Sequence, residues 1–192
     1  DRGYLLRNEL EQLVTFNCDK KKDELVKDLF VFSCFTGLSY SDMKGLKNSN
    51  IQDFFDGNRW IIVRRKKTAT SSNVMLLDIP KMIIEKYAGL SKDGKVFPVP
   101  SNTICNDSLK RISQLIDCLV EKKVTFHLAR HTFATLFLSE GVPLESLSKM
   151  LGHKNIATTQ IYAKILNEKV GKDMQKVSHK FKGMEESFVS SL

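Results

Sequence analysis

The spacing of apolar residues changes in one region of this chain of 192 residues, and that change limits the folds that it can adopt. Residues 22–36 carry apolar side chains at helical intervals over a broad face, and Gly37 follows them as a helix stop. Three later segments are rich in β-branched and aromatic residues, as strands are: 51–55, 60–65 and 74–79. The turn sequence Asp56-Gly57-Asn58 joins the first two. An α+β fold is therefore predicted, mostly helical, with a small three-stranded antiparallel sheet.

Helical patterns dominate the rest of the chain. Apolar spacing and end signals predict further helices at residues 5–16, 39–46, 80–87, 107–120, 126–139 and 143–150. Ser39 and Asp42 form a Ser-x-x-Asp variant of the capping box at the start of one of them. Asn155 is placed to cap a helix that carries Tyr162. Residues 66–73 are basic and rich in hydroxyl groups, which predicts a loop that meets phosphate.

The composition favours an anionic partner. A net charge of +8 and a pI near 9.3 are typical of proteins that bind a polyanion, with a highly charged solvated surface as the alternative. A hydrophobic content of 42% is ordinary for one well-buried domain. No apolar run approaches the length of a membrane span, so a cytoplasmic protein without membrane contact is expected. The four cysteines show neither close pairing nor ligand spacing, which predicts reduced thiols.

Five residues between Thr125 and Tyr162 could converge on one phosphate group. His127, Arg130 and His131 stand at i, i+3 and i+4, so they share one face of a helix. An arginine fork matches two phosphate oxygens, and a histidine can donate to a third oxygen or move a proton. His153 and Tyr162 follow, and a tyrosine hydroxyl beside such a face is a candidate nucleophile. Because free tyrosine has a pKa of about 10, a neighbour must accept its proton or stabilise the phenolate.

Each of these residues also has a plainer interpretation. Arg130 could form a surface ion pair, and either His127 or His153 could be a structural polar group. Tyr162 could simply pack at the edge of the core, near Ile161 and Leu166. The functional interpretation is favoured because all of these residues occur together.

The order His-x-x-Arg, then Leu-Gly-His, then Tyr nine positions after that histidine resembles the catalytic signature of the tyrosine recombinases, also called the phage-integrase family. The resemblance runs from about Leu5 to the mid-160s and is nearest to integrases of conjugative and mobilizable elements. It implies a tyrosine recombinase catalytic-domain fold in residues 1–182, a C-terminal tail at 183–192, and DNA-binding domains upstream of this chain.

The resemblance also implies an activity and a role for each motif residue. DNA strands would be cut and rejoined through a 3′-phosphotyrosine, without metal or another cofactor, during integration or excision of a mobile element. Tyr162 would be the nucleophile and Arg130 would stabilise charge on the phosphate. His127 would transfer a proton or bind the phosphate, and His153 would donate to a non-bridging oxygen. His131 would orient Arg130 or act directly, and it is also a candidate DNA contact.

The family takes the proton for the leaving 5′ oxygen from a lysine on a hairpin of the sheet. Lys67, which precedes Thr68, matches the family's Arg-x-Lys-Thr pattern better than Lys66 does. Lys66 and Arg64 are predicted to bind DNA phosphates instead.

One position departs from the family pattern. The family's Thr-Gly-Leu is usually followed by an arginine that forms a second phosphate fork, whereas here it is followed by Ser39. Residues i and i+2 of a strand point to the same side, so Arg65 accompanies Lys67 while Arg64 faces away. Arg65 is therefore the candidate substitute for the missing arginine. Ser39 itself is expected to be a helix cap.

The implied partner is double-stranded DNA, bound by a tetramer of a protein that is monomeric off DNA, with accessory DNA-bending proteins and a bacterial, nucleoid-associated location. Three alternatives stand beside this hypothesis. A type IB topoisomerase-like enzyme uses similar chemistry, and a catalytically impaired DNA-binding module would explain Ser39. A zinc hydrolase built on His127, His131 and His153 is disfavoured by Arg130 among the ligands and by the lack of a glutamate base.

The end of the chain carries apolar residues at helical spacing on both sides of a break predicted at Gly183: Met174, Val177, Phe181, Phe188, Val189 and Leu192. This segment either covers its own domain or docks on a neighbouring protomer, as C-terminal segments of the family commonly do.

Overall fold

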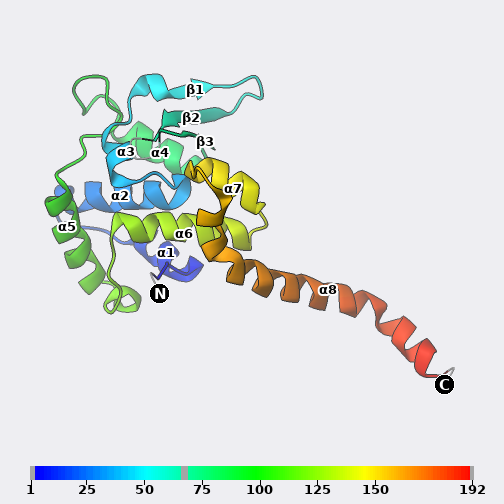
Figure 1. Ribbon diagram of the computed structural model, residues 1–192. Coiled ribbons are helices and arrows are strands. Elements are labelled where there is room, and N and C mark those ends of the chain that lie inside the picture. The colour runs from blue at the N-terminus through cyan, green and yellow to red at the C-terminus, as the bar shows by residue number, and fades with distance from the viewer. Residues whose placement is uncertain (1–2, 66–68, 191–192) are drawn as a thin grey trace.

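The computed structural model describes residues 3–65 and 69–190 (Figure 1). The α-helices are α1 (Arg7–Thr15), α2 (Lys21–Thr36), α3 (Tyr40–Lys44), α4 (Asp78–Lys86), α5 (Asn102–Gln114), α6 (Phe126–Ser139), α7 (Leu144–Leu151) and α8 (Ala163–Val189). The strands are β1 (Ile51–Asp53), β2 (Arg59–Arg64) and β3 (Ser71–Met75). Short 3₁₀ helices are η1 (Asn48–Asn50), η2 (Asp117–Leu119), η3 (Ile156–Thr158) and η4 (Gln160–Tyr162). The predicted fold, mostly helical with a small three-stranded antiparallel sheet, is confirmed.

Helix α2 is the centre of the core. It contacts α1, α4, α5 and α6, and Leu29, Phe30 and Phe32 on it are fully buried. Gly37 ends the helix with a φ of 67°, as predicted. A Cβ atom at Gly37 would lie 2.6 Å from the Phe133 ring, so glycine also lets the end of α2 approach α6 closely. This close approach brings the end of α2 beside the helix that carries the histidines.

The sheet lies above the helices in Figure 1, in the order β1-β2-β3 with antiparallel pairing. Ile61 of β2 pairs with Ile51 on one side and Val74 on the other. The predicted bounds of the third strand were wrong, because β3 begins at Ser71 and α4 begins at Asp78. Residues of low strand propensity pair with β2 there, and the Ser72 hydroxyl donates to the Met150 carbonyl of α7. The sheet edge is thereby joined to α7.

Two helix starts also differ from the prediction. Helix α5 begins at Asn102, where the Ser101 side chain caps it, instead of at residue 107. Asn155 caps η3, and Tyr162 lies in η4, a single 3₁₀ turn before α8, instead of within an α-helix capped by Asn155. Helix α6 has the predicted bounds and is capped by Thr125.

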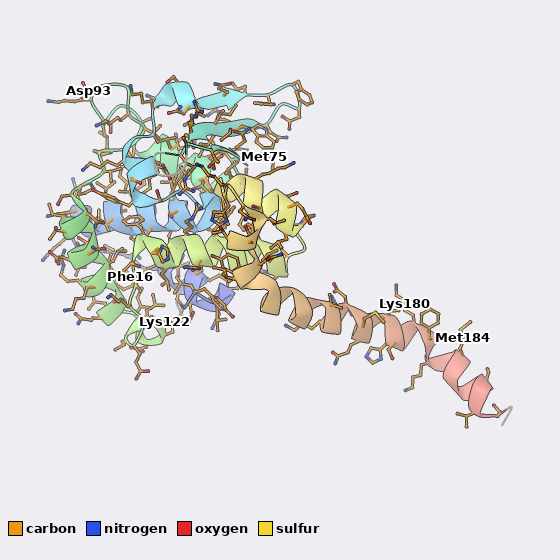
Figure 2. The ribbon with its side chains drawn as sticks, in the orientation of Figure 1. Phe16, Met75, Asp93, Lys122, Lys180 and Met184 are labelled. Carbon is orange, nitrogen blue, oxygen red and sulfur yellow. The ribbon has the colours of Figure 1, made fainter. Side chains whose placement is uncertain are left out.

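Helix α8 extends away from the rest of the domain (Figure 1). It runs through Gly183, so the predicted break there is wrong. The side chains of Val170, Met174, Val177, Phe181 and Met184 are 40% to 68% exposed. Met184 and Lys180 project from the free part of the helix in Figure 2. Leu192 and the side chains of Leu166 and Phe188 lie outside the described part of the chain.

No described helix is both long enough and apolar enough to cross a membrane.

Candidate active site

Helix α6 carries the predicted histidine and arginine side chains, and the three differ in how deeply they are buried. Phe126, Leu128 and Ala129 are buried and fix the rotation of the helix on the core. His127 is consequently exposed, Arg130 is half-buried, and His131 is buried. The three side chains therefore span the distance from solvent to the interior.

Arg130 joins the ends of two helices. Its Nη1 atom donates to the Gly37 carbonyl at 2.5 Å, and its Nη2 atom donates to the Leu151 carbonyl at 2.6 Å. These carbonyls lie at the C-termini of α2 and α7, where peptide oxygens lack partners within the helix and the helix dipole is negative. Nη2 also lies 3.0 Å from Nε2 of His153. The arginine is held by backbone groups that fold around it.

Arg65 lies beside Arg130 at the same carbonyl. Its Nη1 atom donates to the Leu151 oxygen at 2.6 Å, and its side chain is only 8% exposed. The neighbouring Arg64 is exposed on the other side of the strand end, and its Nε donates to the Ala69 carbonyl at 2.8 Å. Arg64 and Arg65 thus point in opposite directions, with Arg65 on the side of Arg130.

Asp42 compensates the charge of Arg65. Its Oδ2 atom is 2.6 Å from Arg65 Nε, in an ion pair that lacks good hydrogen-bond alignment, and the Asp42 side chain is 3% exposed. Oδ2 also accepts a hydrogen bond of 2.6 Å from the Ser39 hydroxyl. Ser39 caps α3, as predicted, by accepting from the Asp42 N–H. The residue in place of the family's arginine therefore supports the carboxylate that holds Arg65.

The two guanidinium groups destabilise each other electrostatically. Burial, followed by the nearby Arg65 charge, lowers the pKa of Arg130, and burial lowers the pKa of Arg65 despite the opposing effect of Asp42. Like charges in a partly buried site favour binding of an anion, and a phosphate would supply the missing negative charge.

Gly152 makes room for Arg65. It ends α7 with a φ of 60°, and a Cβ atom there would lie 2.7 Å from Arg65 Cγ. The Gly152 carbonyl also accepts a hydrogen bond of 2.5 Å from the Thr70 hydroxyl. The end of α7 therefore contacts both sides of the connection between β2 and β3.

His153 is neutral near pH 7 in this site. Burial and then the nearby Arg130 charge lower its pKa from 6.5 to about 4. Because arginine can only donate, Nε2 of His153 accepts from Arg130, and the ring proton is on Nδ1. Nδ1 lies 2.8 Å from the Thr159 hydroxyl, which therefore accepts from it.

Tyr162 ends a chain of hydrogen bonds that reaches the surface. Its hydroxyl is 2.6 Å from Nδ1 of His131, and Nε2 of His131 is 3.0 Å from Nε2 of His127. A neutral phenol donates to His131, whose other nitrogen can donate to His127. Since His127 is exposed, a proton that leaves Tyr162 has a continuous path to solvent. Tyr162 is 6% exposed and belongs to a buried apolar cluster with Phe133 and Leu151, whereas Ile161, which the packing interpretation placed beside it, is 61% exposed.

His131 lies beside the candidate nucleophile, where a direct role was one of its predicted alternatives. Its two ring nitrogens contact Tyr162 and His127 inside the protein, so it bears on the tyrosine directly. Its roles in DNA contact and in orienting Arg130 stay predictions. Lys66, Lys67 and Thr68 lie outside the described residues.

Sequence reasoning missed two side chains of this site. Asp42 was expected only as part of a helix cap, and Thr159 was not singled out. The Ser-x-x-Asp spacing signalled a local cap but not the pairing with Arg65, which lies in a different element. Nothing in the sequence next to Thr159 signals its contact with His153.

A hollow of about 360 Å³, lined mostly by residues with polar side chains, opens beside the exposed end of this cluster. Its lining includes Arg130, His127, Ser39 and the amides Asn102 and Asn106. In the part of the chain that is described, no group of three or more His, Cys, Asp or Glu side chains is placed to hold a metal ion. The arrangement suits binding of a phosphate and transfer of a proton.

The sequence profile of the phage integrase family matches residues 4–169. The chain belongs to the phage integrase family. It is 32% identical over 156 residues to the tyrosine recombinase XerA of Saccharolobus solfataricus, covering 81% of this chain and 50% of that protein. It is 29% identical over 182 residues to XerA of Thermococcus onnurineus, covering 90% and 61%. The chain thus spans only about half to three-fifths of these relatives.

Solved structures of family members share the fold. The XerH recombinase in a post-cleavage complex with its palindromic difH substrate superposes with a TM-score of 0.71 at 20% identity, covering 90% of this chain and 52% of that one. The catalytic domain of the bacteriophage HP1 integrase gives a TM-score of 0.66 at 19% identity, covering 91% and 95%. The described fold is therefore that of a tyrosine recombinase catalytic domain.

Proposed function

We propose that this chain is the catalytic domain of a site-specific DNA recombinase, an integrase of a mobile element, that acts through a 3′-phosphotyrosine. The observation that carries the proposal is the hydrogen-bond chain from Tyr162 to His131 and His127 beside the paired guanidinium groups of Arg130 and Arg65. The catalytic unit is proposed to end at residue 182, within the continuous helix α8, with 183–192 as the tail. DNA-binding domains are proposed to precede it in the whole protein, and the greater length of the relatives is consistent with this.

The reaction is a transesterification in which the tyrosine replaces a DNA hydroxyl. Tyr162 Oη bonds to phosphorus as the bond from phosphorus to the 5′ oxygen breaks, and the DNA 3′ end stays attached as a phosphotyrosine. The phenolic proton passes to His131 and onward to His127. Lys67 gives a proton to the leaving 5′ oxygen. Attack by another strand's 5′ hydroxyl then reverses these steps, and the exchange needs no ATP because the phosphate ester bond is conserved.

The two arginines stabilise charge on the non-bridging oxygens. Nη1 and Nη2 of Arg130 and Nη1 of Arg65 donate to the Gly37 and Leu151 carbonyls. Charge-assisted hydrogen bonds to phosphate are about twice as strong as bonds to a neutral acceptor, so a scissile phosphate competes for these donors. Arg65 supplies the second cation that Ser39 cannot supply, and Asp42 holds it in place.

The partner is double-stranded DNA. XerH and the Tn1549 transposon integrase, which share this fold, are seen in complexes with DNA. Arg64 and Lys66 are proposed as further DNA contacts, and the basic charge of +8 favours association with phosphates. The predicted DNA contact of His131 is not carried into this proposal, because its ring is buried between Tyr162 and His127. A tetramer forms on DNA from monomers, with accessory DNA-bending proteins, in the bacterial cytoplasm at the nucleoid.

The deciding experiment is capture of the covalent intermediate. The protein that contains this chain is incubated with DNA of its element's ends in which sulfur replaces the 5′ bridging oxygen, so that religation is suppressed. A protein–DNA adduct is expected with the natural sequence and none with Tyr162→Phe, although both bind DNA with similar affinity. An adduct that survives Tyr162→Phe removes the nucleophile from this proposal.

A supercoiled plasmid separates the rival enzyme. A topoisomerase would relax its supercoils without pairing two DNA sites, whereas a recombinase requires both sites to be paired. The relatives given above carry the name recombinase, which favours the second outcome. A catalytically impaired module would bind the DNA and leave no adduct under any of these conditions.

A further inference from the structure

Thr159 contacts both His153 and the proposed nucleophile, Tyr162. Its side chain is completely buried, and its hydroxyl lies 2.8 Å from Nδ1 of His153. Its carbonyl accepts from the Tyr162 N–H at 3.1 Å, and its own N–H donates to the Ile156 carbonyl at 2.7 Å. One residue thus fixes the ring of His153 through its side chain and the turn of Tyr162 through its backbone.

The contacts of His153 place its ring proton on Nδ1, whereas its proposed role at the phosphate needs a proton on Nε2. In the structure Nε2 accepts from Arg130, so the proton is on Nδ1 and is donated to Thr159. To stabilise a non-bridging phosphate oxygen, Nε2 must instead carry a proton and donate it. A neutral ring meets this requirement only by moving the proton from Nδ1 to Nε2 through solvent.

Charging the ring would be the other way to protonate Nε2, and this site opposes it. Burial and the adjacent guanidinium groups keep the pKa of His153 at about 4. A bound phosphate offsets part of the guanidinium charge but leaves the burial. The tautomer of the neutral ring therefore decides whether His153 can donate.

The group that faces Nδ1 determines whether both tautomers are available. A carbonyl or carboxylate at this position would accept only and would favour the tautomer with the proton on Nδ1. A hydroxyl accepts in one rotation about its Cβ–Oγ bond and donates in the other. Thr159 therefore satisfies Nδ1 in either state without leaving a buried polar atom unpaired.

We infer that Thr159 is a positioning residue whose hydroxyl reverses its hydrogen bond when DNA binds, so that His153 changes from an acceptor for Arg130 to a donor for the scissile phosphate. This inference rests on the proposed recombinase function. It assigns to Thr159 an effect on the chemical step that acts through His153.

The test compares three substitutions in the protein that contains this chain. Thr159→Val keeps the branched shape and removes the hydroxyl, Thr159→Ser keeps the hydroxyl, and Thr158→Val is the matched control at an exposed neighbour. Adduct formation is timed at saturating phosphorothiolate DNA. Thr159→Val is expected to be about 10- to 100-fold slower, by analogy with loss of a group that orients a metal-ligating histidine. Thr159→Ser and Thr158→Val are expected to stay near the natural rate.

A double-mutant cycle distinguishes positioning from general structural damage. If Thr159 acts through His153, Thr159→Val causes no further loss in a His153→Ala protein. The inference is overturned if Thr159→Val slows adduct formation by the His153→Ala protein as much as it slows the natural protein. It is also overturned if Thr159→Val and Thr158→Val react at equal rates. If the natural protein forms no adduct at all, the proposed function itself is wrong.

A second measurement leaves Thr159 intact. The ¹⁵N shifts of His153 are recorded in Tyr162→Phe protein, free and bound to duplex DNA carrying the element's ends. The ring proton is expected on Nδ1 in the free protein and on Nε2 in the complex. A proton that stays on Nδ1 in the complex overturns the inference, even if Thr159→Val fails to fold.

Discussion

Replacing Arg65 with alanine should slow DNA cleavage far more than replacing Arg64, although each change removes one positive charge beside the same strand end. Arg65 shares the Leu151 carbonyl with Arg130, whereas Arg64 is exposed and donates to Ala69. Removing one group that stabilises charge in a transition state typically costs 10²- to 10³-fold in rate, or about 3 to 4 kcal/mol. Arg65→Ala should show that loss, and Arg64→Ala should stay near the natural rate.

The same substitution should also reduce the free energy of unfolding, because it leaves Asp42 buried without its cation. The Asp42 side chain is 3% exposed, and breaking a buried ion pair costs about 3 to 5 kcal/mol. The Ser39 hydroxyl still donates to Asp42, so we expect a loss near the lower end of that range. Arg65→Ala combined with Asp42→Asn removes the orphaned charge, and should regain stability without regaining cleavage.

The assay measures the first-order rate of adduct formation at saturating phosphorothiolate DNA, with thermal melting of each variant as the stability control. DNA affinity should fall similarly for both alanine variants. For each, the slope of log affinity against log salt concentration should become shallower by about one. Equal cleavage rates for Arg64→Ala and Arg65→Ala would refute the assignment of Arg65. The second cation would then have to come from another residue, with Arg59 of β2 next to test.

Four further outcomes are expected. Lys67→Ala should lose cleavage of ordinary DNA and regain it when the leaving oxygen is sulfur, which departs without an acid. Stability should fall as the pH drops from about 6.5 to 4, because an unfolded His153 binds a proton there and the folded one does not; His153→Gln should flatten that slope in urea unfolding. Gly152→Ala should cost about 1 to 2 kcal/mol for its φ of 60° and should also slow cleavage by displacing Arg65. Deletion of 183–192 should leave single-site cleavage intact and weaken recombination.

Matched variants decide these outcomes. Lys66→Ala should need no rescue by sulfur, and the reverse pattern would move the acid to Lys66. Gly171 is a helical glycine with open space around it, so Gly171→Ala should leave the free energy of unfolding unchanged or raise it. If Gly171→Ala and Gly152→Ala lose equal stability, backbone strain at position 152 is not the cause. A persistent pH slope in His153→Gln would assign the titration to another group. If deletion of 183–192 lowers both the melting temperature and the cleavage rate, the tail packs on the core of its own domain.

The sequence predicted an element correctly where the spacing of its apolar residues and the capping residues at its ends indicate the same bounds. Helix α6 matched because its apolar residues repeat at helical spacing and Thr125 caps it. Strand β3 was misplaced because Ser71, Ser72 and Asn73 have little strand propensity of their own. Their conformation is decided by pairing with β2 and by the contact of Ser72 with Met150, 78 residues away.

The candidate site shows the same limit. Arg64 and Arg65 point in opposite directions as strand parity predicted, although Arg65 follows the last residue of β2. The predicted pairing of Arg65 with Lys67 lies outside the described residues. The partners of these side chains could not be predicted, since Asp42 and Leu151 belong to other elements. The hydrogen bond between Tyr162 and His131 likewise depends on how η4 folds back onto α6.

The position of the second cation changes which part of the fold controls the site. An arginine at position 39 would extend from the start of α3, whereas Arg65 follows β2 on the same hairpin as the proposed acid Lys67, two residues later. That hairpin is fixed to α7 through Ser72 and Thr70 and to α3 through Asp42. Substitutions at these contacts should therefore impair charge stabilisation and protonation of the leaving group together. In a site that keeps its arginine at position 39, the two functions would be separable by mutation of the hairpin alone.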